Sequence, residues 1–420
     1  MSTDFFRNIA KLFSANVIAG VVGLAFYPVL TRLYEPADFG LLSLFSSIVG
    51  VLVILSTADL QYAIMLPKDN SQANAVAHNA LICTVCVVAV TLLSGIFAKP
   101  IANLFNAEGL AKIWWLIPIM VLICAVWNIA NYHFTRNKSF SYISAYLLTQ
   151  GTLIPVFKLI FALAGATVGG LIYGSVAGAA IAVCAVMLTA ITRNKITLIP
   201  SSALERKQAL HTFRRFPIFS LPRSVINNLS SNIPSLLLTP FFGLAPIGLF
   251  SIGLTFGFRP VNMLENSVYQ VFFQQISQSV NQRQPIMPTI RKFVRYTLLI
   301  LAPLTIAGLL LLSYLTGWLL GNEWVETGHY LRILLPWLVT SLFVAPICFL
   351  SDIFQKQPQA LGFEILLISC RIIGMAIGIW TDNFSLSVLG YSIGGAIAIT
   401  AQFIWYMTLA KSYDSSLTED

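Results

Sequence analysis

Long hydrophobic runs, separated by short polar segments, cover most of this chain. Read in windows of about 19 residues, they predict membrane-spanning helices, because backbone amides in hydrocarbon must form their hydrogen bonds within their own segment. The composition agrees, with 57% hydrophobic and 10% charged residues and a mean hydropathy of +0.80. We predict an all-α integral membrane protein with about twelve spans: residues 12–30, 39–63, 76–97, 113–133, 141–163, 167–191, 217–240, 247–273, 296–320, 331–351, 360–380 and 385–410.

Basic residues are distributed unevenly among the predicted loops. With the N-terminus inside, seventeen Lys and Arg residues fall in cytoplasmic segments and four in external ones. This bias is typical of cytoplasmic loops and predicts that both termini are cytoplasmic. It also accounts for the net charge of +9 through contact with anionic lipid, so we expect no nucleic acid partner.

The basic segment 193–216 divides the predicted spans into two groups of six. We therefore predict an N-terminal bundle at residues 1–192, a cytoplasmic linker at 193–216 and a C-terminal bundle at 217–420. A shift of 208 positions places Ala37, Gly40, Leu41 and Ser43 on Ala245, Gly248, Leu249 and Ser251. Because each half begins on the same side of the membrane, the repeat is a parallel one, and transporters built this way bind substrate near the membrane midplane.

Seven ionisable residues fall inside the predicted spans. Such residues are costly in hydrocarbon and normally face a cavity or a partner. Arg259 and Arg371 lie near the middle of their spans, whereas a residue near a span end can extend to the interface. The others are Asp59, Lys158, Arg223, Glu265 and Glu364.

Two predicted helices carry polar faces. Arg223, Asn227 and Ser231 recur at four-residue steps in one, and Arg259, Asn262, Asn266 and Gln270 share a face of the next. These faces indicate either a wet cavity or a set of hydrogen bonds between helices.

Four cations and three acids at membrane depth favour a cationic lumen. Guanidinium groups bind phosphate oxygens in pairs, so the expected ligand is anionic, such as a pyrophosphate. We predict that Arg259, Arg371, Arg223 and Lys158 bind substrate, and that Asn227, Ser231, Asn262, Asn266 and Gln270 line the lumen. Asp59, Glu265 and Glu364 are candidates for coupling to a proton or sodium ion.

Enzymatic motifs are absent from the sequence. It has no Gly-Lys dipeptide and hence no Walker A loop, and its histidines and cysteines form no zinc-ligand cluster. We expect a protein that is not an enzyme, with no catalytic residues, no metal site of this kind and no cofactor.

The run Thr31–Gly40, TRLYEPADFG, resembles the signature after the first helix of Wzx-type lipid-linked oligosaccharide flippases of the MOP exporter superfamily. Ala58–Ile64, Gly248–Ser251, Arg259-Pro260 and Tyr269–Phe273 resemble further positions of that family. The resemblance implies a V-shaped pair of six-helix bundles in the bacterial inner membrane. It also implies alternating access that moves an undecaprenyl-diphosphate-linked oligosaccharide, such as an O-antigen or another surface polysaccharide unit, to the periplasmic leaflet.

Partners follow from the same resemblance. They are the lipid-linked oligosaccharide, membrane lipid, and the polysaccharide polymerase and chain-length regulator of lipopolysaccharide or other polysaccharide biosynthesis. Two alternatives stay open: a multidrug or organic-cation antiporter of the same superfamily, and a membrane glycan polymerase or ligase. The latter predicts an essential external residue among Glu323, His329 and Arg332.

Overall fold

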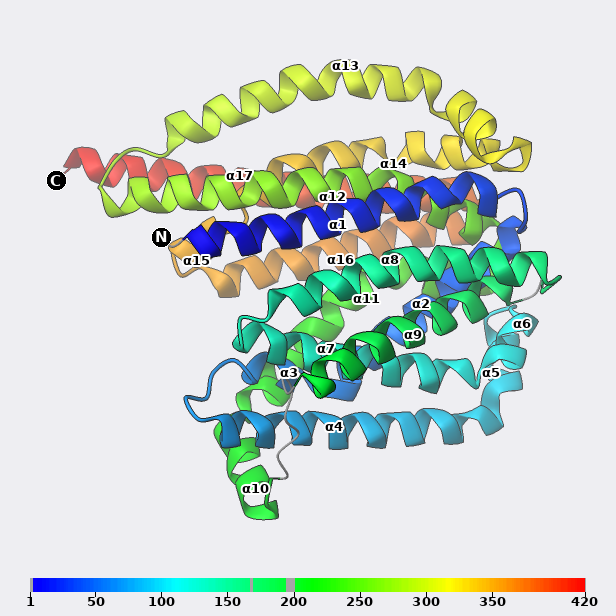
Figure 1. The fold of residues 1–420 in the computed structure, drawn as a ribbon. Coiled ribbons are helices and arrows are strands. Elements are labelled where there is room, and N and C mark those ends of the chain that lie inside the picture. The colour runs from blue at the N-terminus through cyan, green and yellow to red at the C-terminus, as the bar shows by residue number, and fades with distance from the viewer. Residues whose placement is uncertain (1–2, 167–168, 194–200, 420) are drawn as a thin grey trace. The chain divides into compact units, whose positions relative to one another are not determined.

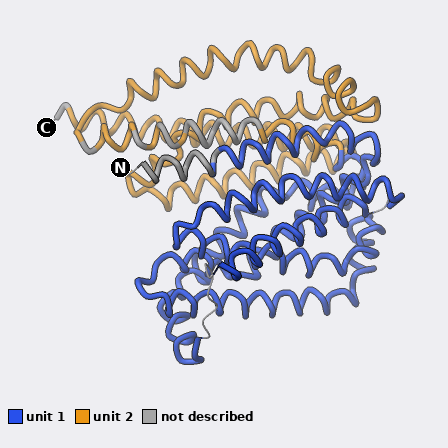
Figure 2. The backbone as a smooth tube through the Cα atoms, viewed as in Figure 1, with its two compact units in different colours: residues 1–248 blue, residues 249–420 orange. Residues whose placement is uncertain are grey.

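A computed structural model describes residues 3–166, 169–193 and 201–419, and every regular element in these residues is helical (Figure 1). The side chains of residues 260–268, which include Asn262, Glu265 and Asn266, and that of Gln270 lie outside the description. The chain divides into two compact units, residues 1–248 and 249–420 (Figure 2).

The first unit holds the helices up to α11 and the first turn of α12. They are α1 (Thr3–Leu30), α2 (Pro36–Thr57), α3 (Leu60–Ala63), α4 (Asn70–Leu93), η1 (Ser94–Phe97), α5 (Ala98–Leu104), α6 (Glu108–Ile113), α7 (Leu116–Arg136), α8 (Phe140–Leu163), α9 (Gly170–Thr192), α10 (Ala203–Thr212), η2 (Phe216–Ser220) and α11 (Leu221–Phe242). α2 packs on α4, α7 and α11, and α8 packs between α1 and α9.

The second unit contains the rest of the chain. Its elements are α12 (Leu244–Asn281), α13 (Met287–Leu320), η3 (Asn322–Trp324), α14 (Val325–Val344), η4 (Ala345–Ile347), α15 (Leu350–Ile353), α16 (Gln357–Trp380) and α17 (Phe384–Glu419). α17 packs on both α14 and α16, and α13 packs on α14.

Nine helical stretches of the described chain are long and apolar enough to cross a membrane: 36–57, 70–104, 116–136, 140–163, 170–192, 287–320, 322–353, 357–380 and 384–417. Shorter apolar stretches lie in α1 at Ser14–Leu30 and in α12 at Leu244–Arg259. α11 is not among them because polar residues interrupt it. The protein is a multi-pass membrane protein.

The start of α2 explains the sharpest sequence signature. Glu35 is the N-cap, Pro36 occupies the first helical turn, and the Glu35 amide donates to Asp38 Oδ2 at 3.2 Å. Proline with its fixed φ suits this position, and the reciprocal side chain satisfies an amide that the helix leaves free. The run Glu-Pro-Ala-Asp therefore specifies where the second long helix begins.

Glycines bring helices into close contact in both units. A Cβ at Gly174 of α9 would lie 2.5 Å from the Lys158 amide nitrogen of α8. In the second unit, Gly374 of α16 faces Gly390 of α17 so closely that a Cβ on either would overlap the other's carbonyl. Small residues permit such approach of helices in a membrane.

The compact units differ in extent from the predicted bundles. α10 packs on α4 and α11 packs on α2, so these two helices belong to the first unit, whereas the predicted C-terminal bundle begins at residue 217. Packing divides the chain at 248 because α11 forms its described contacts with earlier helices. The six-plus-six division stays a prediction.

Candidate functional site: a polar cavity around Asp59

The helical conformation is interrupted directly after α2, at Ala58 and Asp59. The span predicted at 39–63 is not continuous, because Ala58 and Asp59 both adopt left-handed backbone conformations, with φ of 51° and 56°. Each such residue costs about 1–2 kcal/mol for an L-amino acid, and strained positions of this kind cluster at functional sites. The break turns the chain into the short helix α3 and directs Asp59 to the interior.

Asp59 is buried and satisfied by neutral donors. Its side chain is 1% exposed, and its Oδ2 accepts hydrogen bonds from Ser224 Oγ at 2.6 Å and Ser220 Oγ at 2.8 Å. Gln61 Nε2 donates to Oδ1 over a long 3.4 Å. Asp59 sits near a predicted span end but does not extend to the interface, because hydroxyls of η2 and α11 hold it inside.

A polar cavity of about 470 Å³ opens beside this carboxylate. Five elements contribute to its wall: α2, the α2–α3 break with α3, α7, η2 and α11. The lining residues are Ile54, Asp59, Gln61, Tyr62, Asn128, Ser220, Arg223, Ser224, Asn227 and Asn228. Arg223 and Asn227 are exposed, so a guanidinium and an amide are available to a ligand.

The polar residues of α11 divide into two stripes. Arg223 and Asn227 line the cavity, and Ser231 lies one turn further, where its Oγ donates to the Asn227 carbonyl at 3.2 Å. The second stripe, at four-residue steps, comprises Ser220, Ser224, Asn228 and Asn232. It faces Asp59 and α2.

Hydrogen bonds join this second stripe to α2. Ser47 Oγ donates to Asn232 Oδ1 at 3.1 Å, and the hydroxyls of Ser43 and Ser235 are 2.8 Å apart. Part of the polarity of α11 therefore serves helix packing, which is the second of the two interpretations that the sequence left open. The remainder lines the cavity.

Arg371 lies in a different setting, inside the second unit. Its side chain is 3% exposed, and its guanidinium carbon lies 4.3 Å from the Trp337 ring centre and 4.6 Å from that of Tyr391. Phe258 packs on Trp337 with ring centres 4.1 Å apart. The aromatic faces stabilise the cation away from water. Whether Arg371 contacts substrate stays a prediction.

The other predicted site residues are dispersed. Arg259 is exposed on α12, and Lys158 is half-buried on α8, where its carbonyl accepts a hydrogen bond from the Tyr34 hydroxyl at 2.8 Å. Glu364 is half-buried on α16, and its Oε2 accepts no hydrogen bond from the described residues. Asn262, Glu265, Asn266 and Gln270 lie outside the described side chains.

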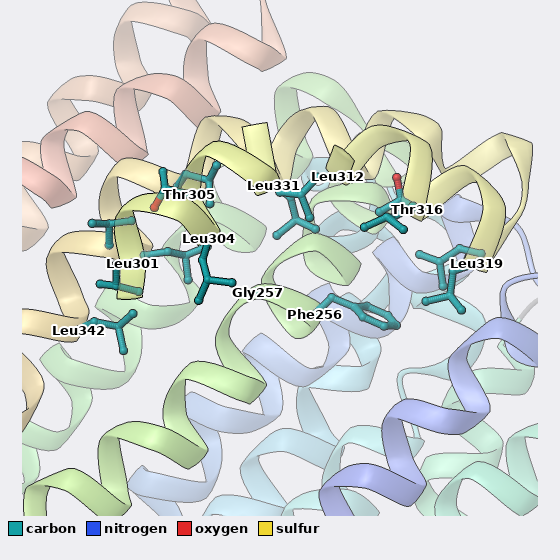
Figure 3. A pocket seen from close by; sticks show the side chains of 16 residues that line it. Phe256, Gly257, Leu301, Leu304, Thr305, Leu312, Thr316, Leu319, Leu331 and Leu342 are labelled. Atoms are coloured by element: carbon teal, nitrogen blue, oxygen red, sulfur yellow. The ribbon is translucent and has the colours of Figure 1, made fainter. Parts of the chain in front are cut away.

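A second cavity, of about 380 Å³, lies in the second unit between α12, α13 and α14 (Figure 3). Leu301, Leu304 and Leu312 of α13 face Leu331 and other residues of α14 across it. Its lining is apolar apart from Thr305 and Thr316. Among the described residues, this cavity has no charged side chain that could bind a polar headgroup, and its apolar lining suits a hydrocarbon chain.

The sequence left Ser220, Ser224 and Gln61 out of the site. The four-residue step from Ser220 to Asn232 was a usable signal, because such a stripe occupies one face of a helix. The sequence carried no comparable signal for Gln61, since its burial depends on the turn at Ala58 and Asp59.

Comparisons with known proteins agree on fold and family. A model of the polysaccharide biosynthesis protein family matches residues 29–328. The succinoglycan biosynthesis transport protein ExoT of Rhizobium meliloti (strain 1021) is 21% identical over 318 residues, which are 75% of this chain and 63% of the length of that relative.

Solved structures match over nearly the whole chain. The lipid II flippase MurJ, in an inward closed conformation, aligns with a TM-score of 0.75 and 13% identity, covering 97% of this chain and 90% of that one. An inward-facing MATE family multidrug resistance transporter gives a TM-score of 0.65 at 13% identity, covering 96% and 95%. A point mutant of the Vibrio cholerae MATE transporter VcmN gives 0.61 at 15%, covering 100% and 99%.

This is therefore a multi-pass membrane protein with the fold of the MOP superfamily. The chain belongs to the polysaccharide biosynthesis protein family, and the resemblance to Wzx-type proteins is confirmed at that level.

Proposed function

We propose that this protein moves lipid-linked oligosaccharide units, carried on undecaprenyl diphosphate, from the cytoplasmic to the periplasmic leaflet of a bacterial inner membrane. Its family and the transport role in the name of its relative ExoT support a part in polysaccharide export. The units would then pass to a polysaccharide polymerase and chain-length regulator.

The observation that carries the proposal is the polar cavity lined by Arg223, Asn128 and Asn227. A glycan headgroup cannot cross hydrocarbon with its hydroxyls unsatisfied, because each unpaired polar group costs about 2–7 kcal/mol. Amide and hydroxyl groups in a cavity of about 470 Å³ replace part of that hydration.

The charge of the cavity favours an anionic ligand. Asp59 is 1% exposed and hydrogen-bonded by two hydroxyls, whereas Arg223 is exposed. A ligand in the cavity therefore meets the guanidinium and is shielded from the carboxylate. Phosphate oxygens bind a guanidinium through paired, charge-assisted hydrogen bonds.

We also propose the finer architecture of about twelve spans in two six-helix bundles, arranged as a V with a parallel repeat and cytoplasmic termini. Reciprocal contacts support the repeat. Gly40 packs on the Leu244 carbonyl and Gly248 packs on that of Pro36, and the 208-position shift relates Gly40 to Gly248 and Pro36 to Leu244. A parallel repeat is a common architecture for alternating access.

The apolar cavity of the second unit suits a lipid chain. Polyprenyl chains need only hydrocarbon contact, and its lining by leucines of α13 and α14 provides this (Figure 3). The same cavity also suits an ordinary acyl chain, so it supports a lipidic substrate without selecting the prenyl group.

The competing function is export of organic cations, which the shared fold permits. Such a ligand needs an accessible carboxylate, and Asp59 is shielded by Ser220 and Ser224. Dye sensitivity of a deletion strain, with intact surface polysaccharide, would favour this competitor.

Complementation of a deletion strain tests the proposed function. Arg223→Ala should lower surface polysaccharide about tenfold or more at unchanged membrane protein level, because a charge-assisted hydrogen bond contributes about 1.5–3 kcal/mol. Arg223→Lys should retain part of the export. Lys207→Ala, an exposed basic residue on α10, is the matched control. Full export by Arg223→Ala would overturn the role of the cavity.

A further inference from the structure

Four side chains that line the polar cavity carry oxygen atoms. Asp59 contributes two carboxylate oxygens, Ser220 and Ser224 contribute hydroxyls within 2.8 Å of Oδ2, and Gln61 contributes an amide carbonyl. They come from the α2–α3 break, α3, η2 and α11, so the cluster joins segments about 160 residues apart.

The carbonyl oxygen of Gln61 indicates that a ligand binds here. Gln61 is 5% exposed and lines the cavity, yet its buried Oε1 accepts no hydrogen bond from the described residues. Buried oxygens of native proteins almost always have a donor, a water or a cation as partner. The amide nitrogen of the same side chain donates to Asp59 Oδ1 at 3.4 Å, so the Gln61 side chain lies next to the carboxylate in the cavity wall.

The carboxyl end of α2 lies at the same place. α2 ends at Thr57, so the negative end of its helix dipole lies at the break that carries Asp59. Interrupted membrane helices use such ends, with neighbouring oxygens, to hold monovalent cations.

The composition of the cluster selects the kind of cation. It holds one carboxylate and otherwise neutral oxygens, and no group of three His, Cys, Asp or Glu residues occurs in the described chain. One negative charge balances a single positive charge, and hard oxygen donors suit an alkali ion better than a transition metal.

We propose that Asp59, Gln61, Ser220 and Ser224 form a binding site for a monovalent metal cation. On binding, the two serine hydroxyls turn their lone pairs to the cation and donate instead to a carbonyl one helical turn earlier, a common bond for serine in helices. The Gln61 carbonyl gains its missing partner. Cation binding would then hold α3 against α11 and neutralise Asp59, leaving Arg223 as the uncompensated charge of the cavity.

The site does not depend on the proposed transport function, because binding can be measured without a substrate. Thermal unfolding of the purified full-length protein in detergent would be followed while NaCl replaces choline chloride at constant total salt and fixed pH. A cation that binds only the folded state raises the unfolding temperature in a saturable way. We expect this rise for the wild type and no rise for Asp59→Asn.

Gln61→Leu separates the contribution of the Gln61 carbonyl from that of the Asp59 charge. It removes the carbonyl and keeps the carboxylate, so the Na⁺ concentration at half-saturation should rise about tenfold or more. Ser224→Ala should raise it as well and serves as a second test should Asp59→Asn fail to fold. Ser231→Ala is the matched control, since its hydroxyl bonds within α11, and it should titrate like the wild type.

Three outcomes would overturn the site: no NaCl-specific stabilisation of the wild type, equal stabilisation of Asp59→Asn, or unchanged half-saturation in Gln61→Leu. A fourth is stabilisation by lower pH with none by Na⁺, which would show a proton as the occupant. Arg223 and Tyr62 face the same cavity, and variants of them would identify a titration that does not belong to Asp59.

Discussion

Gly40 and Gly248, which are 208 positions apart, meet where the first turns of α2 and α12 cross. A Cβ at Gly248 would lie 2.9 Å from the Gly40 amide nitrogen. A Cβ at Gly40 would overlap the Leu244 carbonyl, and one at Gly248 would overlap the Pro36 carbonyl. The contact is reciprocal under the same shift that aligns the two sequence segments.

Gly248→Ala should lower the stability of the protein. The added methyl must displace backbone atoms, and such overpacking costs about 1–3 kcal/mol. Gly362→Ala is the matched control, because a Cβ there meets nothing within 4 Å, and it should be neutral or slightly stabilising. Thermal unfolding in detergent measures both. Equal stability of the two variants would contradict the close contact.

Arg371 and Trp337 should be energetically coupled. With the guanidinium 4.3 Å from the ring centre and the side chain 3% exposed, the coupling free energy should be about 1–2 kcal/mol. A double-mutant cycle with Arg371→Met and Trp337→Leu measures it. Additive effects would mean that the ring does not stabilise the cation.

Tyr34 should make stability depend on alkaline pH. Burial, with a smaller contribution from nearby Asp38, raises the pKa of Tyr34 from 10.0 to about 12. Its protonated hydroxyl donates to the Lys158 carbonyl at 2.8 Å. The stabilisation is complete below the unfolded pKa and is lost as pH rises through the folded value.

Tyr34→Phe should therefore cost about 1 kcal/mol at neutral pH, the net value of one hydrogen bond. The difference in unfolding free energy between wild type and variant should vanish as pH rises above about 10 and should favour the variant by about pH 12, since only the wild type must ionise this buried group. Unfolding midpoints across this range provide the measurement. A constant gap would show that the hydroxyl does not titrate with folding.

Arg136 should hold the segment that follows α3. Its guanidinium donates to the carbonyls of Ile64 at 3.2 Å, Pro67 at 2.6 Å and Lys68 at 3.2 Å. A lysine ammonium cannot reproduce this fork, so Arg136→Lys should lose about 1–3 kcal/mol of stability. Arg193→Lys, at the exposed end of α9, should lose no stability. A similar loss of stability in both variants would contradict a stabilising role of the Arg136 hydrogen bonds.

Hydropathy predicted most of the fold, because lipid requires long apolar helices whatever their packing. It did not predict the interruption of α2, since two left-handed residues, Ala58 and Asp59, leave no trace in a hydropathy window. The correspondence of Gly40 and Gly248 was visible in the sequence, because close helix contact admits only glycine at these two positions.

The site was predicted less completely. Arg223 and Asn227, which line the polar cavity, could be singled out because a polar stripe on a spanning helix requires a polar surrounding. The position of Asp59 near a predicted span end did not reveal that hydroxyls keep its side chain buried. The position of Arg371 near a span centre did not reveal that aromatic rings lie against it. Such partners come from helices distant in sequence, so neither periodicity nor depth identifies them.

Translocation by the purified protein is the most direct test of the central claim, that the cavity beside Arg223 carries an anionic lipid-linked headgroup across the membrane. Proteoliposomes would be loaded with undecaprenyl-diphosphate-linked saccharide, and its appearance in the opposite leaflet followed for the wild type, Arg223→Ala and Lys207→Ala. We predict equal rates for the wild type and Lys207→Ala and a rate at least about tenfold lower for Arg223→Ala. Translocation by Arg223→Ala at the wild-type rate, or none by the wild-type protein, would contradict it.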